Sequence, residues 1–161
     1  MGVELGELSV QDLLGLNRQI LAELRARNVV RTANPPAGDW AELLVKTVTG
    51  GSLAPNSEKS FDVLTPDGAR LQVKARLLDP DKVGSQTLSA IRSWNFDELV
   101  VILFRPDDFR VAAAASIPVA SVKTLARHSS HVNAFIVRPT RALLALGEDW
   151  TAEVMHAAET F

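Results

Sequence analysis

Residues 61–76 read FDVLTPDGARLQVKAR, and this pattern predicts a β-hairpin. The Pro-Asp-Gly sequence at residues 66–68 suits a three-residue turn, in which proline sets one φ angle and glycine adopts the left-handed conformation. Such a turn places Asp62 on one strand directly opposite Gln72 on the other. The hairpin therefore brings a carboxylate and an amide side by side.

The two faces of this hairpin differ in chemistry. Because residues two apart in a strand share a face, Gln72, Lys74 and Arg76 project from one side of the second strand. Directly opposed residues also share a face, so Asp62 joins them. A slip of one residue in the pairing would turn Asp62 to the other face. With the predicted register, we expect Asp62, Gln72 and Lys74 to converge on one polar patch.

These residue types suit a divalent metal site. Mg²⁺ prefers hard oxygen ligands and keeps several waters. The Asp62 carboxylate, the Gln72 amide oxygen and the Val73 carbonyl can supply three such ligands, and Glu42 on the preceding predicted helix can add a second carboxylate, directly or through water. The Lys74 ammonium beside them can orient an attacking water and stabilise negative charge on a phosphate. This chemistry predicts metal-assisted hydrolysis of a phosphodiester.

The spacing of Asp62 and the Gln-Val-Lys sequence at 72–74 resembles the PD-(D/E)xK nuclease superfamily. The similarity is to the variant in which glutamine replaces the acidic residue, as in Mrr-type restriction endonucleases. Residues 38–45, which include Glu42, resemble the helix that contributes an extra glutamate in that superfamily. Residues 89–98 are similar to uncharacterised restriction-endonuclease-like proteins.

The resemblance covers roughly residues 38–105 and carries expectations about fold and activity. It implies a restriction endonuclease-like core, an α/β (α+β) architecture with a mixed central sheet of four to five strands flanked by helices. It also implies a nuclease that uses Mg²⁺ or Mn²⁺, with double-stranded DNA as substrate. Members of this group often form homodimers that cut both strands, so we expect a homodimer as well.

Ordinary structural roles are the alternative for each of these residues. Glu42 could close a capping box with Asp39, Asp62 could be a solvated edge residue, and Lys74 and Arg76 could be outward-facing charges on an antiparallel strand. A second hypothesis is therefore a catalytically weak or inactive domain of the same fold that binds nucleic acid or another protein. A third, an unrelated ligand-binding α/β domain, requires a different hairpin register.

Composition limits the class of protein. The chain has 161 residues, of which 47% are hydrophobic, and this length and composition predict a single domain over residues 1–161 with a proper core. Cysteine is absent, which excludes disulfides and thiolate zinc sites. No apolar run reaches membrane-spanning length, and the acidic start lacks the basic region of a signal peptide. We expect a cytoplasmic protein without a membrane partner.

Charge is unevenly distributed along the chain, whose formal net charge is −2. Residues 46–141 carry thirteen basic and nine acidic side chains, whereas residues 142–161 carry four acidic and no basic ones. A basic middle can present a positive face to phosphate, although ordinary surface charge explains the same numbers. The candidate phosphate contacts are Lys46, Arg70, Arg76 and Arg92.

Periodicity predicts the remaining elements. Ser9 begins an amphipathic N-terminal helix over residues 9–28, whose apolar stripe contains Leu13, Leu16, Ile20 and Leu24. A core of roughly 38–140 follows. Its first helix is expected to have Asp39 as N-cap and to stop at Gly50-Gly51. We expect strands at 98–104, 109–117 and 134–137, and helices at 88–94, 119–127, 141–146 and 150–158, the last two forming a C-terminal helical tail over 141–161.

Overall fold

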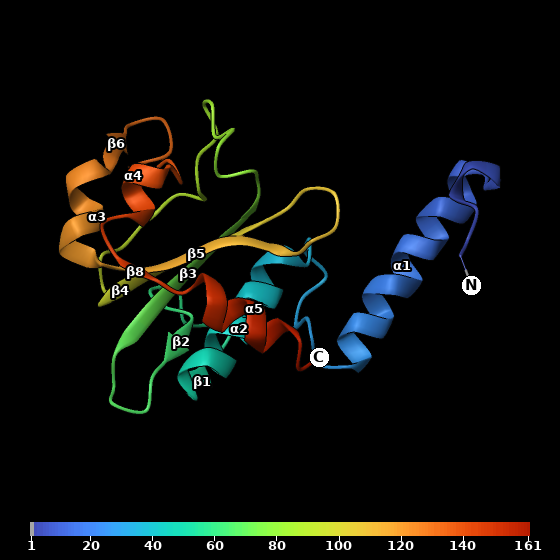
Figure 1. Cartoon of the computed structure of the whole chain (residues 1–161), viewed down its shortest axis with the longest axis horizontal. Helices are drawn as coiled ribbons and strands as arrows, with labels where there is room; N and C mark the ends of the chain where they lie inside the picture. The colour runs from blue at the N-terminus through green and yellow to red at the C-terminus, as the bar shows by residue number, and fades with distance from the viewer. Residues whose placement is uncertain (1) are drawn as a thin grey trace.

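The computed structural model describes residues 2–161 and contains a six-stranded mixed sheet in the order β1-β2-β3-β4-β5-β8 (Figure 1). The β3 and β4 strands are parallel, and the other neighbours in this sheet are antiparallel. The strands are β1 (Ser52–Leu53), β2 (Val63–Leu64), β3 (Arg70–Leu77), β4 (Glu98–Phe104), β5 (Val111–Pro118) and β8 (Glu148–Asp149).

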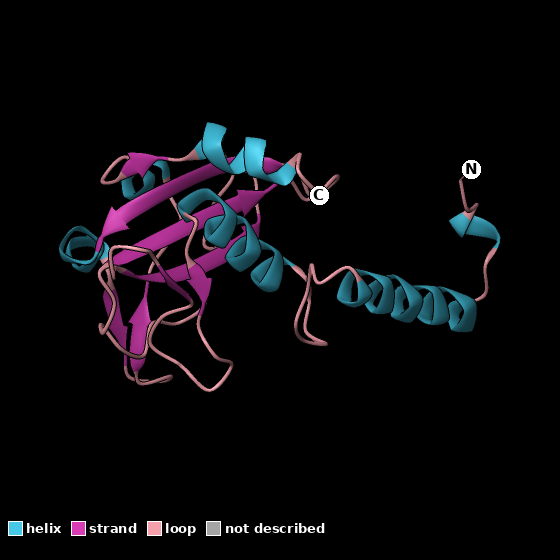
Figure 2. Ribbon diagram, turned by 90° about the horizontal axis from the view of Figure 1, so that it is seen from below, coloured by secondary structure: helices cyan, strands magenta, loops and turns pink. Residues whose placement is uncertain are grey.

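Helices lie against both faces of the sheet (Figure 2). The α2 and α5 helices pack on one face, and α3, α4 and the long 78–97 connection cover the other. The helices are the 3₁₀ turn η1 (Leu5–Glu7), α1 (Val10–Ala26), α2 (Ala37–Thr49), α3 (Val119–Leu125), α4 (Arg141–Leu144) and α5 (Thr151–Ala158). The mixed α/β architecture flanked by helices is thus confirmed.

The central strand β4 has the predicted bounds and is buried on both faces. Its alternate residues Val100, Ile102 and Phe104 belong to the core on the α2–α5 side. The intervening Leu99, Val101 and Leu103 belong to the core on the α3–α4 side. A continuous β-branched and apolar run is what such a strand requires.

The hairpin forms in the predicted register. Val63 pairs with Leu71 and Leu64 with Arg70, which places Asp62 across from Gln72. The turn over residues 66–68 contains Gly68 with φ +91°, a conformation that glycine adopts without strain.

The α1 helix forms as predicted but stands apart from the sheet (Figure 1). The Ser9 hydroxyl caps it by accepting a hydrogen bond from the Asp12 amide at 3.2 Å. None of its residues is buried. The apolar stripe read from the sequence therefore exists but has no partner within residues 2–161.

The start of α2 differs from the prediction. This helix begins at Ala37, so Asp39 lies within its first turn and is not the N-cap. The Asp39 carboxylate instead accepts hydrogen bonds from the backbone amides of Arg31 and Thr32, at 2.8 and 2.7 Å. The capping box with Glu42 does not form. The stop at Gly50, which has φ +66°, is confirmed.

The helix predicted at 88–94 is wrong. The Leu88 amide donates to the Val137 carbonyl, and Ile91 and Phe135 exchange two backbone hydrogen bonds. The side chains of Leu88, Ile91 and Phe96 are buried in the core on the α3–α4 side of the sheet. Tertiary pairing has overridden the local helical preference.

The edges of the sheet also differ from the prediction. The two-residue strands β1 and β8 raise the number of strands to six. The strand predicted at 134–137 forms as β7 (Ala134–Ile136), but it pairs with β6 (Arg127–Ser129) in a separate two-stranded sheet.

Within residues 2–161, no helix combines the length and the apolar character needed to span a membrane.

Candidate functional site

The backbone of Asp62 is held from both sides. Its amide donates to the Leu71 carbonyl at 2.8 Å, and its carbonyl accepts from the Ala54 amide at 2.8 Å. The residue therefore lies between the start of β3 and the segment that follows β1. A side chain on such a fixed backbone loses little further freedom when it is positioned for chemistry.

The Asp62 carboxylate faces Gln72 and Val73, as the register predicts. Its Oδ2 atom accepts from the Gln72 Nε2 at 2.5 Å and from the Val73 backbone amide at 2.7 Å. No hydrogen bond to Oδ1 is found among the described residues. In this arrangement Gln72 acts as a donor to the carboxylate, and one carboxylate oxygen remains available.

The edge of β3 contributes a backbone oxygen to the same place. The Val73 amide points away from β4, because it donates to Asp62 on the β2 side. The amide and carbonyl of one strand residue point the same way, so the Val73 carbonyl also faces this edge. β2 ends before this point, which leaves the carbonyl beside the Asp62 carboxylate.

Lys74 shares the sheet face of Gln72 and is half-buried. Burial lowers the pKa of Lys74 below its ordinary 10.5, while the carboxylates of Asp62 and Glu42 oppose this by favouring the ammonium. Among the described residues Lys74 forms no ion pair within 4.0 Å, so these two carboxylates act on it at longer range. A cation held this way is partly desolvated and not neutralised by direct contact, so a new anion could approach it.

Glu42 reaches the site from α2, but an arginine occupies one of its oxygens. The Arg31 guanidinium contacts the Glu42 Oε2 at 2.7 Å and donates to the Ala54 carbonyl at 3.0 Å. Burial raises the pKa of Glu42, and the hydrogen bond from Arg31 opposes this effect. Arg31 was not predicted from the sequence, since it lies in a loop outside every motif and only the fold brings it to Glu42.

The Asp62 carboxylate is destabilised in the folded protein. Burial raises the pKa of Asp62 above its ordinary 3.8, and the Val73 amide, Lys74 and Gln72 only partly offset this. Repulsion from the Asp62 carboxylate also raises the pKa of Glu42. Two carboxylates kept together at a cost in folding free energy are typical of a site shaped for binding rather than for stability.

Asp62→Asn is therefore expected to raise the free energy of unfolding at pH 7 in the absence of divalent metal. The folded-state pKa of Asp62 lies above the 3.8 of the unfolded chain, so wild-type protein loses stability relative to the variant as pH rises from 3.8 through the folded pKa. Below that window the two proteins should converge. Urea unfolding in EDTA across this pH range measures the difference. The control is Asp107→Asn, which makes the same substitution at a carboxylate that the fold leaves exposed. A less stable Asp62→Asn at pH 7 would contradict the expectation.

A cleft of about 190 Å³ opens beside Asp62. Four carboxylates line it, with one guanidinium among them, and Lys74 does not reach its wall. The charged lining residues are Arg31, Asp39, Glu42, Glu58 and Asp62. The cleft is acidic, which suits a cation better than a bare phosphate.

No family model matches this sequence, and no curated protein matches it significantly. Within residues 2–161, no three His, Cys, Asp or Glu side chains converge as a metal-binding group. A cation held here would need the Val73 carbonyl or the Gln72 amide besides Asp62 and Glu42.

The four basic residues predicted to contact phosphate have different surroundings. Arg70 forms a two-pronged pair with Asp97, with contacts of 3.1 and 3.2 Å, and also binds Asn95. Arg76 donates to the Thr87 carbonyl at 2.7 Å. Lys46 and Arg92 are exposed, and no hydrogen bond or ion pair of their side chains is found among the described residues. Arg70 and Arg76, which were predicted to contact phosphate, thus form contacts within the protein.

Proposed function

We propose that this chain is a metal-dependent nuclease domain with a restriction endonuclease-like core that hydrolyses phosphodiester bonds in double-stranded DNA. The observation that carries the proposal is the convergence on Asp62. Its carboxylate is fixed by Gln72 and the Val73 amide, with one oxygen unused, and Lys74 lies on the same sheet face. Hairpins that serve only as structure do not need a half-buried acid, an amide and an amine in one place.

The donors present fit Mg²⁺ or Mn²⁺. Asp62 Oδ1 and the second oxygen of Glu42 take no hydrogen bond from described residues, and the Val73 carbonyl faces the same edge. Hard oxygen donors of this kind are what Mg²⁺ prefers. When bound, the cation would supply Lewis-acid stabilisation of the scissile phosphate. Asp62, the Val73 carbonyl and Glu42 would hold it, with the Gln72 amide as a further ligand if its oxygen turns to the site.

The protein's own groups have separate tasks in this proposal. Lys74 orients the attacking water and stabilises the negative charge that develops on phosphate. Gln72 and the Val73 amide keep the Asp62 carboxylate pointing at the reaction. Arg31 holds Glu42 in place and neutralises it before a cation arrives. Lys46 and Arg92 are free to contact the DNA backbone. Arg70 and Arg76 remain bound within the fold, and their positive charges attract the DNA phosphates from there.

Wild-type protein is expected to cut plasmid and short duplex DNA in Mg²⁺ or Mn²⁺ and to lose this activity in EDTA. Asp62→Ala should abolish cutting, because it removes the carboxylate on which the other donors converge. It should also remove Mn²⁺ binding, measured separately by calorimetry. Asp107→Ala, which deletes an exposed carboxylate in the β4–β5 loop, is the matched control and should cut normally. Cutting by Asp62→Ala at the wild-type rate would overturn the proposal.

A second function is favoured by two contacts within the site. Arg31 occupies Glu42, and Gln72 donates to Asp62 rather than presenting its oxygen. Both contacts weaken metal affinity, as expected of a catalytically inactive domain that binds nucleic acid or another protein. In that case the same duplexes should bind in a salt-sensitive way and remain intact in every metal tested.

A further inference from the structure

The α1 helix exposes an apolar face that no residue from 2 to 161 covers. Among its large apolar residues Val10 is 73% exposed, Leu14 64% and Ile20 50%. A helix of this length is marginal in water, and helices in proteins gain most of their stability by packing an apolar face. The helix projects from the sheet along its whole length (Figures 1 and 2). Something outside this chain therefore has to cover the stripe.

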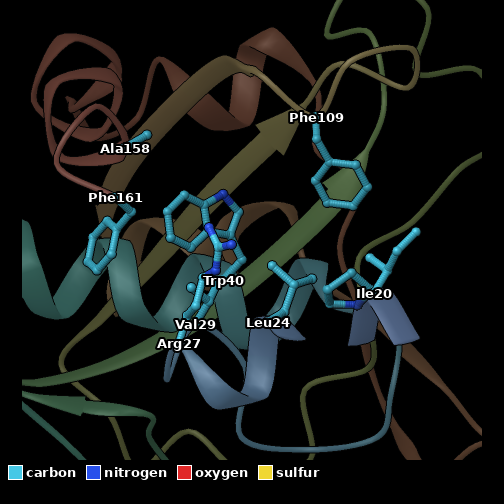
Figure 3. A pocket seen from close by; sticks show the side chains of 9 residues that line it. Ile20, Leu24, Arg27, Val29, Trp40, Phe109, Ala158 and Phe161 are labelled. Atoms are coloured by element: carbon cyan, nitrogen blue, oxygen red, sulfur yellow. The ribbon is translucent and has the colours of Figure 1, made fainter. Parts of the chain in front are cut away.

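The stripe continues into an apolar groove at the base of the helix. This groove has a volume of about 440 Å³, and Ile20 and Leu24 belong to both surfaces. Its other walls are Trp40 from α2, Phe109 from the β4–β5 loop and Phe161 near the end of the chain (Figure 3). The uncovered apolar surface thus runs from the N-terminal half of α1 to the body of the protein.

The charges on this part of the chain identify the occupant. The first twelve residues carry three acidic and no basic side chains, whereas residues 13–27 carry three arginines and one glutamate. Glu4 and Glu7 precede α1, so it is two copies of the whole 4–27 segment that place an acidic stretch against a basic stretch twice when they lie antiparallel, whereas the parallel sense places like against like. The same distribution complements the helix dipole. That effect supports the helix itself but leaves its apolar face uncovered.

We propose that a second copy of this chain covers α1, with the two α1 helices antiparallel about a two-fold axis near Asn17. Val10, Asn17 and Leu24 recur at intervals of seven residues and form one seam of the stripe. With Asn17 opposite its own copy, Val10 lies opposite Leu24. The apolar N-terminal half of each helix then lies beside the C-terminal half of the other, and so at the other's groove.

Two-fold symmetry lets one association cover the apolar surfaces of both copies. Each contact occurs twice in an isologous dimer, so both stripes and both grooves are covered in one association. A helix of 17 residues is about 25 Å long. Two such helices, each also seated at a groove, favour an interface of the roughly 1,200–2,000 Å² found in stable complexes. The proposal is independent of nuclease activity, since no residue of the Asp62 site takes part.

Light scattering across a concentration series tests the association. The full chain is expected to give twice its 17.4 kDa monomer mass, and Ile20→Asp should give the monomer mass. Gln19→Asp is the matched control, because it adds the same charge to the neighbouring position on the opposite side of the helix and should remain a dimer. Circular dichroism checks that both variants stay folded, which the exposure of Ile20 predicts. A wild-type monomer at every concentration would overturn the proposal.

Cysteine crosslinking tests the orientation, because the chain has no cysteine of its own. Asn17→Cys should link two copies through a short bismaleimide. Val10→Cys alone and Leu24→Cys alone should not, whereas a mixture of these two variants should. Self-linking at all three positions would indicate parallel helices, and no linking at any would indicate that another molecule covers α1. Either of these results refutes the antiparallel pairing, whatever the DNA assays show.

Discussion

Lys74→Ala is expected to slow metal-dependent cleavage of duplex DNA by about 10²–10³-fold, the usual cost of removing one group that stabilises charge in a transition state. The physical reason is the position of the ammonium. Lys74 is half-buried, and burial lowers its pKa, so the protein keeps a cation there against a desolvation cost. Such a cation gains most when a new negative charge forms next to it, which happens during phosphoryl transfer.

Single-turnover cleavage with saturating protein measures this rate without interference from DNA binding. The affinity for duplex should change little in Lys74→Ala, because Lys46 and Arg92 are still present to contact the backbone. Lys82→Ala is the matched control: its side chain is 81% exposed in the 78–97 segment, and the variant should cut at the wild-type rate. A wild-type rate in Lys74→Ala would place the ammonium outside the reaction. Loss of DNA binding with no separate effect on rate would make Lys74 a phosphate contact only.

Leu103→Ala is expected to lower the free energy of unfolding by about 2–5 kcal/mol, the range for deleting a buried leucine side chain. Leu103 lies in the central strand β4, is fully buried and is paired with β3 on one side and β5 on the other. Strands on both sides restrain the backbone, so the cavity cannot close by a shift of β4. A loss of this size is a large share of the 5–15 kcal/mol that stabilises most domains.

Urea unfolding, followed by circular dichroism in dilute protein, measures this loss. Leu125→Ala is the control, because Leu125 ends α3 with 43% of its surface exposed and its removal should cost less than about 1 kcal/mol. Equal losses in the two variants would mean that β4 is not the centre of the core.

Local pattern was sufficient for the hairpin that carries the site. Pro66 and Gly68 define the turn, the turn defines the register, and the register alone places Asp62 across from Gln72. The same holds for β4, where a short apolar run rich in β-branched residues favours a strand buried on both faces. In both cases a period of two residues or a turn type leaves few alternatives.

Long-range contacts decided what the sequence could not. The segment 88–94 has a local pattern that favours a helix, yet pairing of Ile91 with Phe135 holds it extended. Asp39 resembles an N-cap but binds the backbone of Arg31 and Thr32 instead. A periodic sequence pattern cannot reveal either contact. Phe135 is 44 positions from Ile91, and the partners of Asp39 lie in an irregular loop.

The amino-acid order by itself determined which side chains share a strand face, because a residue's side of a strand depends only on its distance from the turn. The tertiary structure alone decided which groups surround that face: it brought Arg31 to Glu42, half-buried Asp62 and Lys74, and left α1 without a partner among the described residues. The physical reason is that burial and charge pairing depend on distances between elements, and those distances are set only when the layers pack.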